Sequence, residues 1–174
     1  LDARVTSDDL HRRKLIDAPT AKRRRAVLNY RLAQEARENG DLDAAEGHLR
    51  DAIKLASDFV PAVVDLAGRW VESGKTGKAK KMIEGSWAAG PHPAMLEPYW
   101  AACGAGDALS RVRVTKKLVE RNSDHSESLI ALAKASLEAR LWGEARQFLE
   151  CALAGASGAS AKGCGMMAGL EEKE

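Results

Sequence analysis

Residues 40–55, GDLDAAEGHLRDAIKL, decide the fold, because their pattern returns twice further along the chain. Residues 74–87 read GKTGKAKKMIEGSW, and residues 140–153 read RLWGEARQFLECAL. Each stretch begins with a turn residue and continues with small and aliphatic side chains at helical spacing. The recurrence indicates an internal repeat of two helices rather than a fold built from unrelated elements.

The repeat length follows from matching residues in the first two copies. Gly40 and Gly74 are 34 residues apart, as are Ala45 and Ala79. A 34-residue period with two helices in each unit is typical of tetratricopeptide-like repeats, which usually bind other proteins. The chain of 174 residues is 45% hydrophobic but only 5% aromatic, which predicts a core of Ala, Leu and Val. No alternating run of β-branched residues occurs, so we expect an all-α solenoid.

We expect one domain, 1–174, of about four helix pairs. The predicted units are about 26–59, 60–91, 92–125 and 126–157, with truncated flanking helices at 7–16 and 164–174. The third unit is irregular, because its first helix is short and the second slips by one or two residues against the 34-residue period.

The charge pattern leaves two interpretations open for one segment. The net charge of +2 is too small to indicate a nucleic-acid partner, but residues 1–37 hold ten basic and five acidic side chains. The cluster Lys22-Arg23-Arg24-Arg25 is either a solvated helix start or a contact for an anionic membrane surface or acidic partner.

No group of residues predicts catalysis, a metal site or a cofactor. The three cysteines show no Cys-x-x-Cys pair, which argues against a disulfide framework or zinc site. The four histidines are scattered over different repeats, and no nucleophile motif is present. His92, with Cys103 nearby, is the only candidate for a haem-iron ligand.

A partner is expected to bind the concave surface, which the first helices of such pairs line. By helical spacing, residues not used for packing point into this groove. The expected groove residues are Tyr30, Gln34, Arg37 and Glu38; Val64, Gly68, Val71 and Glu72; Leu96 and Trp100; and Ile130, Lys134, Leu137 and Glu138. This mixture of aliphatic, aromatic and charged groups suits an amphipathic helix or an extended segment. Trp70 and Trp142 are expected in the core.

Longer phrases resemble one family. AKRRRAVLNYRLAQEARENGDLDAAEGHLRDAIKLASDFVPAVVDLA, RNSDHSESLIALAKASLEARLWGEARQFLECAL and CGMMAGLEEKE are similar to the C-terminal repeat region of HemY-type proteins of proteobacteria. The resemblance implies a right-handed superhelix and an inner-membrane protein that associates with the membrane only through N-terminal transmembrane helices, which are absent here. This repeat domain would lie in solution, on the cytoplasmic side.

The same resemblance implies a function without catalysis. HemY-type proteins are associated with late protohaem synthesis, so the resemblance implies a scaffold for other proteins, including late haem-pathway enzymes. The alternative is a tetrapyrrole-binding or transfer module that uses an apolar pocket near Trp100 and His92.

Overall fold

The computed structural model describes residues 17–155, and every regular element in this range is helical. The flanking helices expected at 7–16 and 164–174 lie outside the described residues. In chain order the elements are α2 (Ala18–Glu38), α3 (Leu42–Leu55), α4 (Val60–Glu72), α5 (Thr76–Ala89), η1 (Pro93–Met95), α6 (Leu96–Ala102), α7 (Ala108–Val119), η2 (Glu120–Asn122), α8 (Ser126–Glu138) and α9 (Trp142–Gly155).

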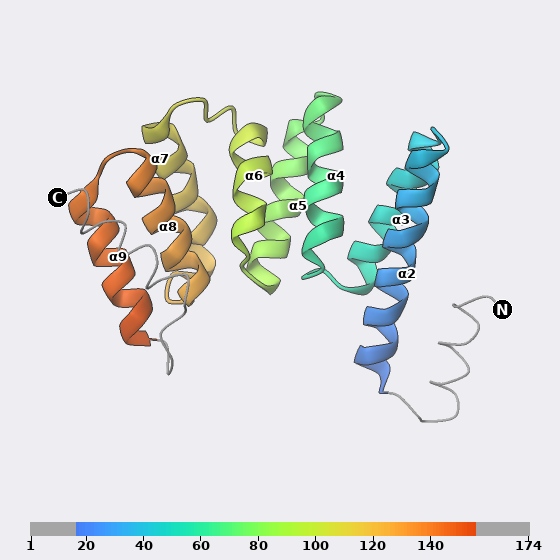
Figure 1. The fold of residues 1–174 in the computed structure, drawn as a ribbon, viewed down its shortest axis with the longest axis horizontal. Coiled ribbons are helices and arrows are strands. Elements are labelled where there is room, and N and C mark those ends of the chain that lie inside the picture. The colour runs from blue at the N-terminus through green and yellow to red at the C-terminus, as the bar shows by residue number, and fades with distance from the viewer. Residues whose placement is uncertain (1–16, 156–174) are drawn as a thin grey trace.

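The helices form an all-α solenoid, as the repeat predicts. Consecutive helices pack in pairs, α2 with α3, α4 with α5, α6 with α7 and α8 with α9, and each second helix also contacts the first helix of the next pair. The pairs follow one another along the long axis of the molecule, with α5 behind α4 and α6 (Figure 1). The right-handed superhelical sense stays a prediction.

One turn joins the two helices of every pair. Each turn contains one residue with a positive φ, between 58° and 78°. In chain order these residues are Gly40, Gly74, Gly104 and Arg140. In each turn this residue donates its N–H to the carbonyl three residues back, and the next N–H bonds five residues back, as Asp41 does to Ala36 at 2.9 Å. The two bonds satisfy carbonyls that the helix end would leave unpaired. Three of the four turns use Gly, which adopts this conformation at low cost.

The third unit departs from the 34-residue period in its first helix as well as in its second. Gly104 follows Gly74 by 30 residues, four fewer than the repeat length and about one helical turn. The first helix of the unit, α6, is correspondingly short at seven residues, and the 3-10 turn Pro93–Met95 precedes it. The loop after Gly104 is two residues longer than the corresponding turn of the second unit. The N-cap Asp107 therefore follows the N-cap Lys75 by 32 residues, two fewer than the repeat length. The expected slip of one or two residues in the second helix is thereby confirmed.

The second and fourth units are in direct contact. The indole N–H of Trp87 on α5 donates to the hydroxyl of Ser128 on α8 at 3.2 Å, and both residues are buried. The amide of Asn122, in the third unit, also donates to the Trp87 carbonyl at 2.9 Å. The core itself is rich in small residues: Ala45, Ala79 and Ala145 are each at most 2% exposed.

Tryptophans occupy the core as expected, with one exception. Trp70 is 8% exposed and Trp87 is fully buried. Trp142 is only half-buried, because it is the first residue of α9 and lies at the end of the helix pair. Its expected place in the core is therefore corrected to the core's edge.

We predict that Arg140→Gly stabilises the fold by about 1 kcal/mol, because an L-residue in the left-handed region is strained and glycine is not. Gly74→Ala should destabilise the fold by a similar amount, because it places an L-residue in the left-handed region. An added Cβ there would meet no atom within 4 Å, so the effect comes from the backbone alone. Urea unfolding measures both. Equal unfolding midpoints for all three proteins would contradict the turn conformation described above.

Candidate partner-binding groove

A pocket of ≈ 390 Å³ opens between α2, α3 and α4. Its walls and floor combine apolar and charged side chains. The lining residues are Ala33, Gln34, Arg37, Leu42, Ala45, Leu49, Val64, Asp65, Gly68, Arg69 and Glu72. Five of the residues expected to face a groove are among them: Gln34, Arg37, Val64, Gly68 and Glu72. The structure therefore brings together five of the eight residues predicted for the groove in the first two units.

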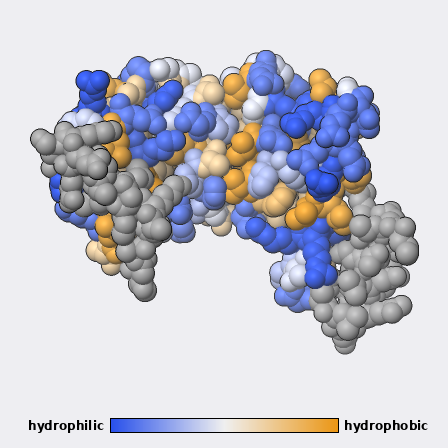
Figure 2. All heavy atoms as spheres, in the orientation of Figure 1, coloured by the Kyte–Doolittle hydropathy of each residue, from blue (hydrophilic) through white to orange (hydrophobic). Residues whose placement is uncertain are grey.

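Helical spacing explains why these residues meet. Val64, Gly68 and Glu72 are four residues apart, so they form one stripe along α4. Gln34 and Arg37 lie on the last turns of α2 and form the opposite wall. Residues of α3 close the floor, including the buried Ala45 and Leu49. Figure 2 shows hydrophobic residues among hydrophilic ones over this part of the molecule.

Gly68 is the reason that the middle of the α4 wall is open. A Cβ built on Gly68 would meet no heavy atom within 4 Å, and the residue is not in the left-handed region. A side chain at this position would therefore project into free space rather than into the core. The pocket depends on the absence of that side chain.

Polar contacts on the α4 wall hold it against the first pair. The Tyr30 hydroxyl donates to Asp65 at 2.9 Å, and its ring packs edge-on against Phe59 with centroids 5.6 Å apart. Burial raises the pKa of the Tyr30 hydroxyl, and the hydrogen bond to Asp65 raises it further. Arg69 donates from Nη2 to the Leu42 carbonyl at 2.8 Å. Tyr30 thus supports the pocket from behind rather than lining it.

Two charged groups at the rim stay available for a ligand. Arg37 on α2 and Glu72 on α4 are both exposed and line the pocket. Neither has an ion pair or side-chain hydrogen bond within residues 17–155. A bound segment could therefore meet a cation on one wall and a carboxylate on the other.

Trp100 does not face the groove, and its expected role is corrected. The residue is 1% exposed, and its indole N–H donates to Thr115 Oγ1 at 2.8 Å. Arg111 lies 4.9 Å from the ring centroid and Lys134 lies 5.3 Å from it. These cations cover the ring, so no partner can reach its face.

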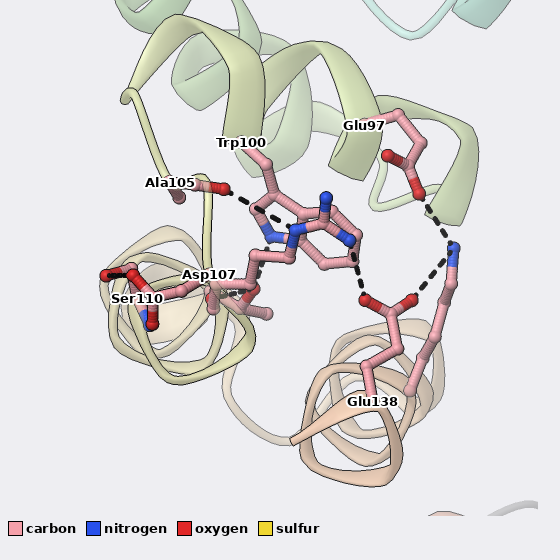
Figure 3. Close-up of polar contacts among 9 residues, drawn as sticks. Glu97, Trp100, Ala105, Asp107, Ser110 and Glu138 are labelled. Atoms are coloured by element: carbon pink, nitrogen blue, oxygen red, sulfur yellow. Dashed lines mark hydrogen bonds and ion pairs between the residues drawn. The ribbon is translucent and has the colours of Figure 1, made fainter.

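Lys134 and Glu138, also expected in the groove, belong to the same cluster (Figure 3). Glu138 pairs with Arg111 at 2.9 Å, and Lys134 pairs with Glu97 at 3.3 Å and lies 3.9 Å from Glu138. The cluster ties α6, α7 and α8 together. Its groups satisfy one another, which makes it a structural junction rather than an open site.

Arg111 was not predicted, although a signal for it exists. Four residues after the second-helix N-caps Asp41 and Lys75 stand the buried residues Ala45 and Ala79. The residue four positions after the corresponding N-cap of the third unit, Asp107, is Arg111. In the third unit a stacked arginine thus occupies the position of a small residue, and period analysis failed here because the unit is shortened.

Four other expected groove residues are buried or half-buried. Ile130 is 2% exposed and Leu96 is fully buried, so neither can contact a partner. The reason is that α8 is contacted by α7, α9 and η1, which leaves it little free surface. Val71 is half-buried against the core, and Leu137 is half-buried too. Glu38 is exposed but does not line the pocket.

The expected pairing of Trp100 with His92 in one pocket is also absent. A second hollow, of ≈ 340 Å³, is lined by Trp100, Arg111 and neighbours, and His92 is not among its lining residues. His92 Nδ1 instead accepts the N–H of Ala94 at 3.1 Å, and the residue caps η1. Within residues 17–155, no group of three or more His, Cys, Asp or Glu side chains could hold a metal ion.

Comparisons with known proteins give a remote similarity. No protein-family model matches the chain, and no curated protein matches it either. Among solved structures the chain is similar to PilF of Pseudomonas aeruginosa, with 14% identity and a TM-score of 0.46 over 98% of this chain and 82% of that chain. Within residues 17–155, no helix is long and apolar enough to cross a bilayer.

We predict that Arg111→Ala destabilises the fold by about 1–2 kcal/mol, because it removes a cation–π contact and an ion pair together. Arg113→Ala is the matched control, since Arg113 is exposed on the same helix without an ion pair among the described residues, and it should stay within about 0.5 kcal/mol. Chemical denaturation compares the two. Equal stability would mean that the Trp100 cluster contributes nothing to the junction.

Proposed function

We propose that this protein is a non-catalytic interaction scaffold that holds a segment of a partner protein in the pocket between α2, α3 and α4. One observation carries the proposal: five residues expected on the groove from two separate first helices border a single pocket. Apolar side chains form its floor, while Arg37 and Glu72 stand at its rim. A cavity with an apolar base and few polar groups suits an anchoring side chain with flanking polar contacts.

The finer assignment rests on sequence resemblance. We infer that the scaffold is the repeat domain of a HemY-type inner-membrane protein, on the cytoplasmic side, and that its partners include late haem-pathway enzymes. The phrases RLWGEAR at residues 140–146 and DFVPAVV at residues 58–64 support this inference. They extend beyond the small and aliphatic positions that any such repeat shares.

Filling the pocket tests the scaffold. Gly68→Trp places a large side chain in the open space of the α4 wall, and it should abolish partner capture without unfolding the protein. Gly47→Trp is the matched control, because Gly47 lies on α3, is exposed and has the same free space around it. Cross-linking of the full-length protein in its native cells, followed by mass spectrometry, identifies the captured proteins.

The outcomes separate the two levels of the proposal. Capture of late haem-pathway enzymes by the wild type and Gly47→Trp, but not by Gly68→Trp, would support both levels. Unrelated proteins lost only in Gly68→Trp would support the pocket and refute the haem assignment. Capture that is equal in all three proteins would exclude the pocket as the contact.

The tetrapyrrole alternative makes a different prediction, which haemin titration checks. We expect no saturable Soret shift that depends on His92, because His92 is engaged in the turn before α6 and does not line the Trp100 hollow. A sharp, saturable shift that His92→Ala removes would establish tetrapyrrole binding instead.

A further inference from the structure

Two neighbouring second helices concentrate the positive charge of the chain. Residues 75–89 contain four Lys and one Glu, and residues 108–121 contain five Lys or Arg and one Glu. Of the 27 basic and 25 acidic residues in the chain, 18 and 23 respectively remain elsewhere. The small net charge therefore hides a strongly basic region on α5 and α7.

These charges lie on two second helices that contribute no residue to the groove pocket. α5 and α7 contact each other, and Figure 1 shows them drawn paler, behind α4, α6 and α8. On α5, Lys81 stands midway between the buried residues Ala79 and Ile83 in sequence, so it points away from the core. On α7, Arg113 and Lys117 are four residues apart and share the exposed face.

We define the basic band as the exposed cations of α5, α7 and the following turn η2 that are not used in contacts with other units. Its members are Lys78, Lys80, Lys81, Arg113, Lys117 and Arg121. Lys75 and Lys116 are excluded, because they pair with Glu46 and Glu144.

The basic band is electrostatically unsatisfied. Within the described residues only Lys80 has an ion pair, a loose one of 3.9 Å to Glu84, and the other five members have none. Lys80 and Lys117 come from different helices yet both act on the Cys103 thiol, whose pKa is raised chiefly by burial. A furrow between the two helices is bordered by Glu84 of α5 and by Lys117 and Arg121.

An exposed leucine accompanies the charges. Leu109 is 60% exposed, the highest value among the large hydrophobic residues exposed in the described chain. It precedes Arg113 by one helical turn, so both lie on the same side of α7. Exposed aliphatic groups amid Lys and Arg are typical of protein surfaces that bind anionic membranes.

The furrow argues against an acidic polypeptide as the ligand. The hollow between α5 and α7, of ≈ 330 Å³, is lined by Glu84 and Glu120 as well as Lys117 and Arg121. A polyanionic chain lying in it would meet two carboxylates. Lys81 and Arg113 instead point outward, where they can meet a broad anionic surface.

The side chains present also disfavour nucleic acid. Among residues 17–155, every Phe, Tyr and Trp residue is buried or half-buried, so bases find no large stacking platform. Lys supplies every cation of the band on α5, and ammonium groups are compact, strongly hydrated charges suited to a hydrated headgroup layer.

We propose that the basic band binds the surface of a membrane that contains anionic lipids, with Leu109 at the level of the headgroups. The groove pocket, to which α5 and α7 contribute no residue, then stays free for a partner. Each Lys or Arg near such a surface contributes to binding, and the contribution is weakened by salt.

Vesicle sedimentation tests this proposal with phosphatidylcholine vesicles and with vesicles of phosphatidylcholine mixed with phosphatidylglycerol. The wild type should bind only the mixed vesicles, and added salt should release it. Lys81→Glu/Arg113→Glu/Lys117→Glu should reduce the partition coefficient roughly a hundredfold, since three surface cations are lost. Leu109→Ser should weaken binding while preserving its dependence on salt.

The control is Arg24→Glu/Arg31→Glu/Lys54→Glu, which changes the net charge equally at exposed positions of α2 and α3 and should leave binding nearly unchanged. Circular dichroism verifies that both triple variants are folded. Absence of binding by the wild type would overturn the proposal, and so would greater loss in the control, which would place the contact on α2. Binding to polyglutamate or duplex DNA but not to mixed vesicles would also overturn it. Gly68→Trp should bind vesicles normally, so failure here and failure of the groove are distinguishable.

Discussion

The left-handed turn between the two helices of each pair is the constraint on which the architecture depends. Two backbone hydrogen bonds close each helix end and reverse the chain within a few residues, so the second helix must pack against the first. Because the turn is short, the paired helices approach closely, and small residues such as Ala45 and Ala79 fill the contact. The close packing of the paired helices also sets the orientation of α4, and with it the direction of the stripe that lines the groove.

The sequence is informative where the period is regular. Glycines 34 residues apart and repeated small residues predict the helices, their turns and the residues that meet in the first pocket. These features are local, since a turn and a helical stripe depend on residues within about one helical turn of each other. Gln34, Arg37, Val64, Gly68 and Glu72 were found for this reason.

Prediction fails where the outcome depends on contacts between units. The burial of Ile130 depends on the packing of α7, α9 and η1 around α8. Trp100 looks like a groove residue by spacing, but cations from two other helices cover its ring. The basic band could not be predicted along the chain either, because its two helices are separated in sequence by α6 and contact each other only in the folded protein.

The contact between the second and fourth units has a mechanical consequence. In a regular solenoid each repeat touches only its neighbours, so the stabilising contacts between units join adjacent repeats alone. Here the Trp87–Ser128 bond joins the second unit to the fourth, and the Asn122–Trp87 bond joins the second unit to the third, so the last three pairs are linked beyond nearest neighbours. The pocket has one wall on the first pair and one on the second. The spacing of its walls is therefore set by the contact between these two pairs, which the Tyr30–Asp65 and Arg69–Leu42 hydrogen bonds help to hold. A segment bound in the pocket would bridge the first two pairs.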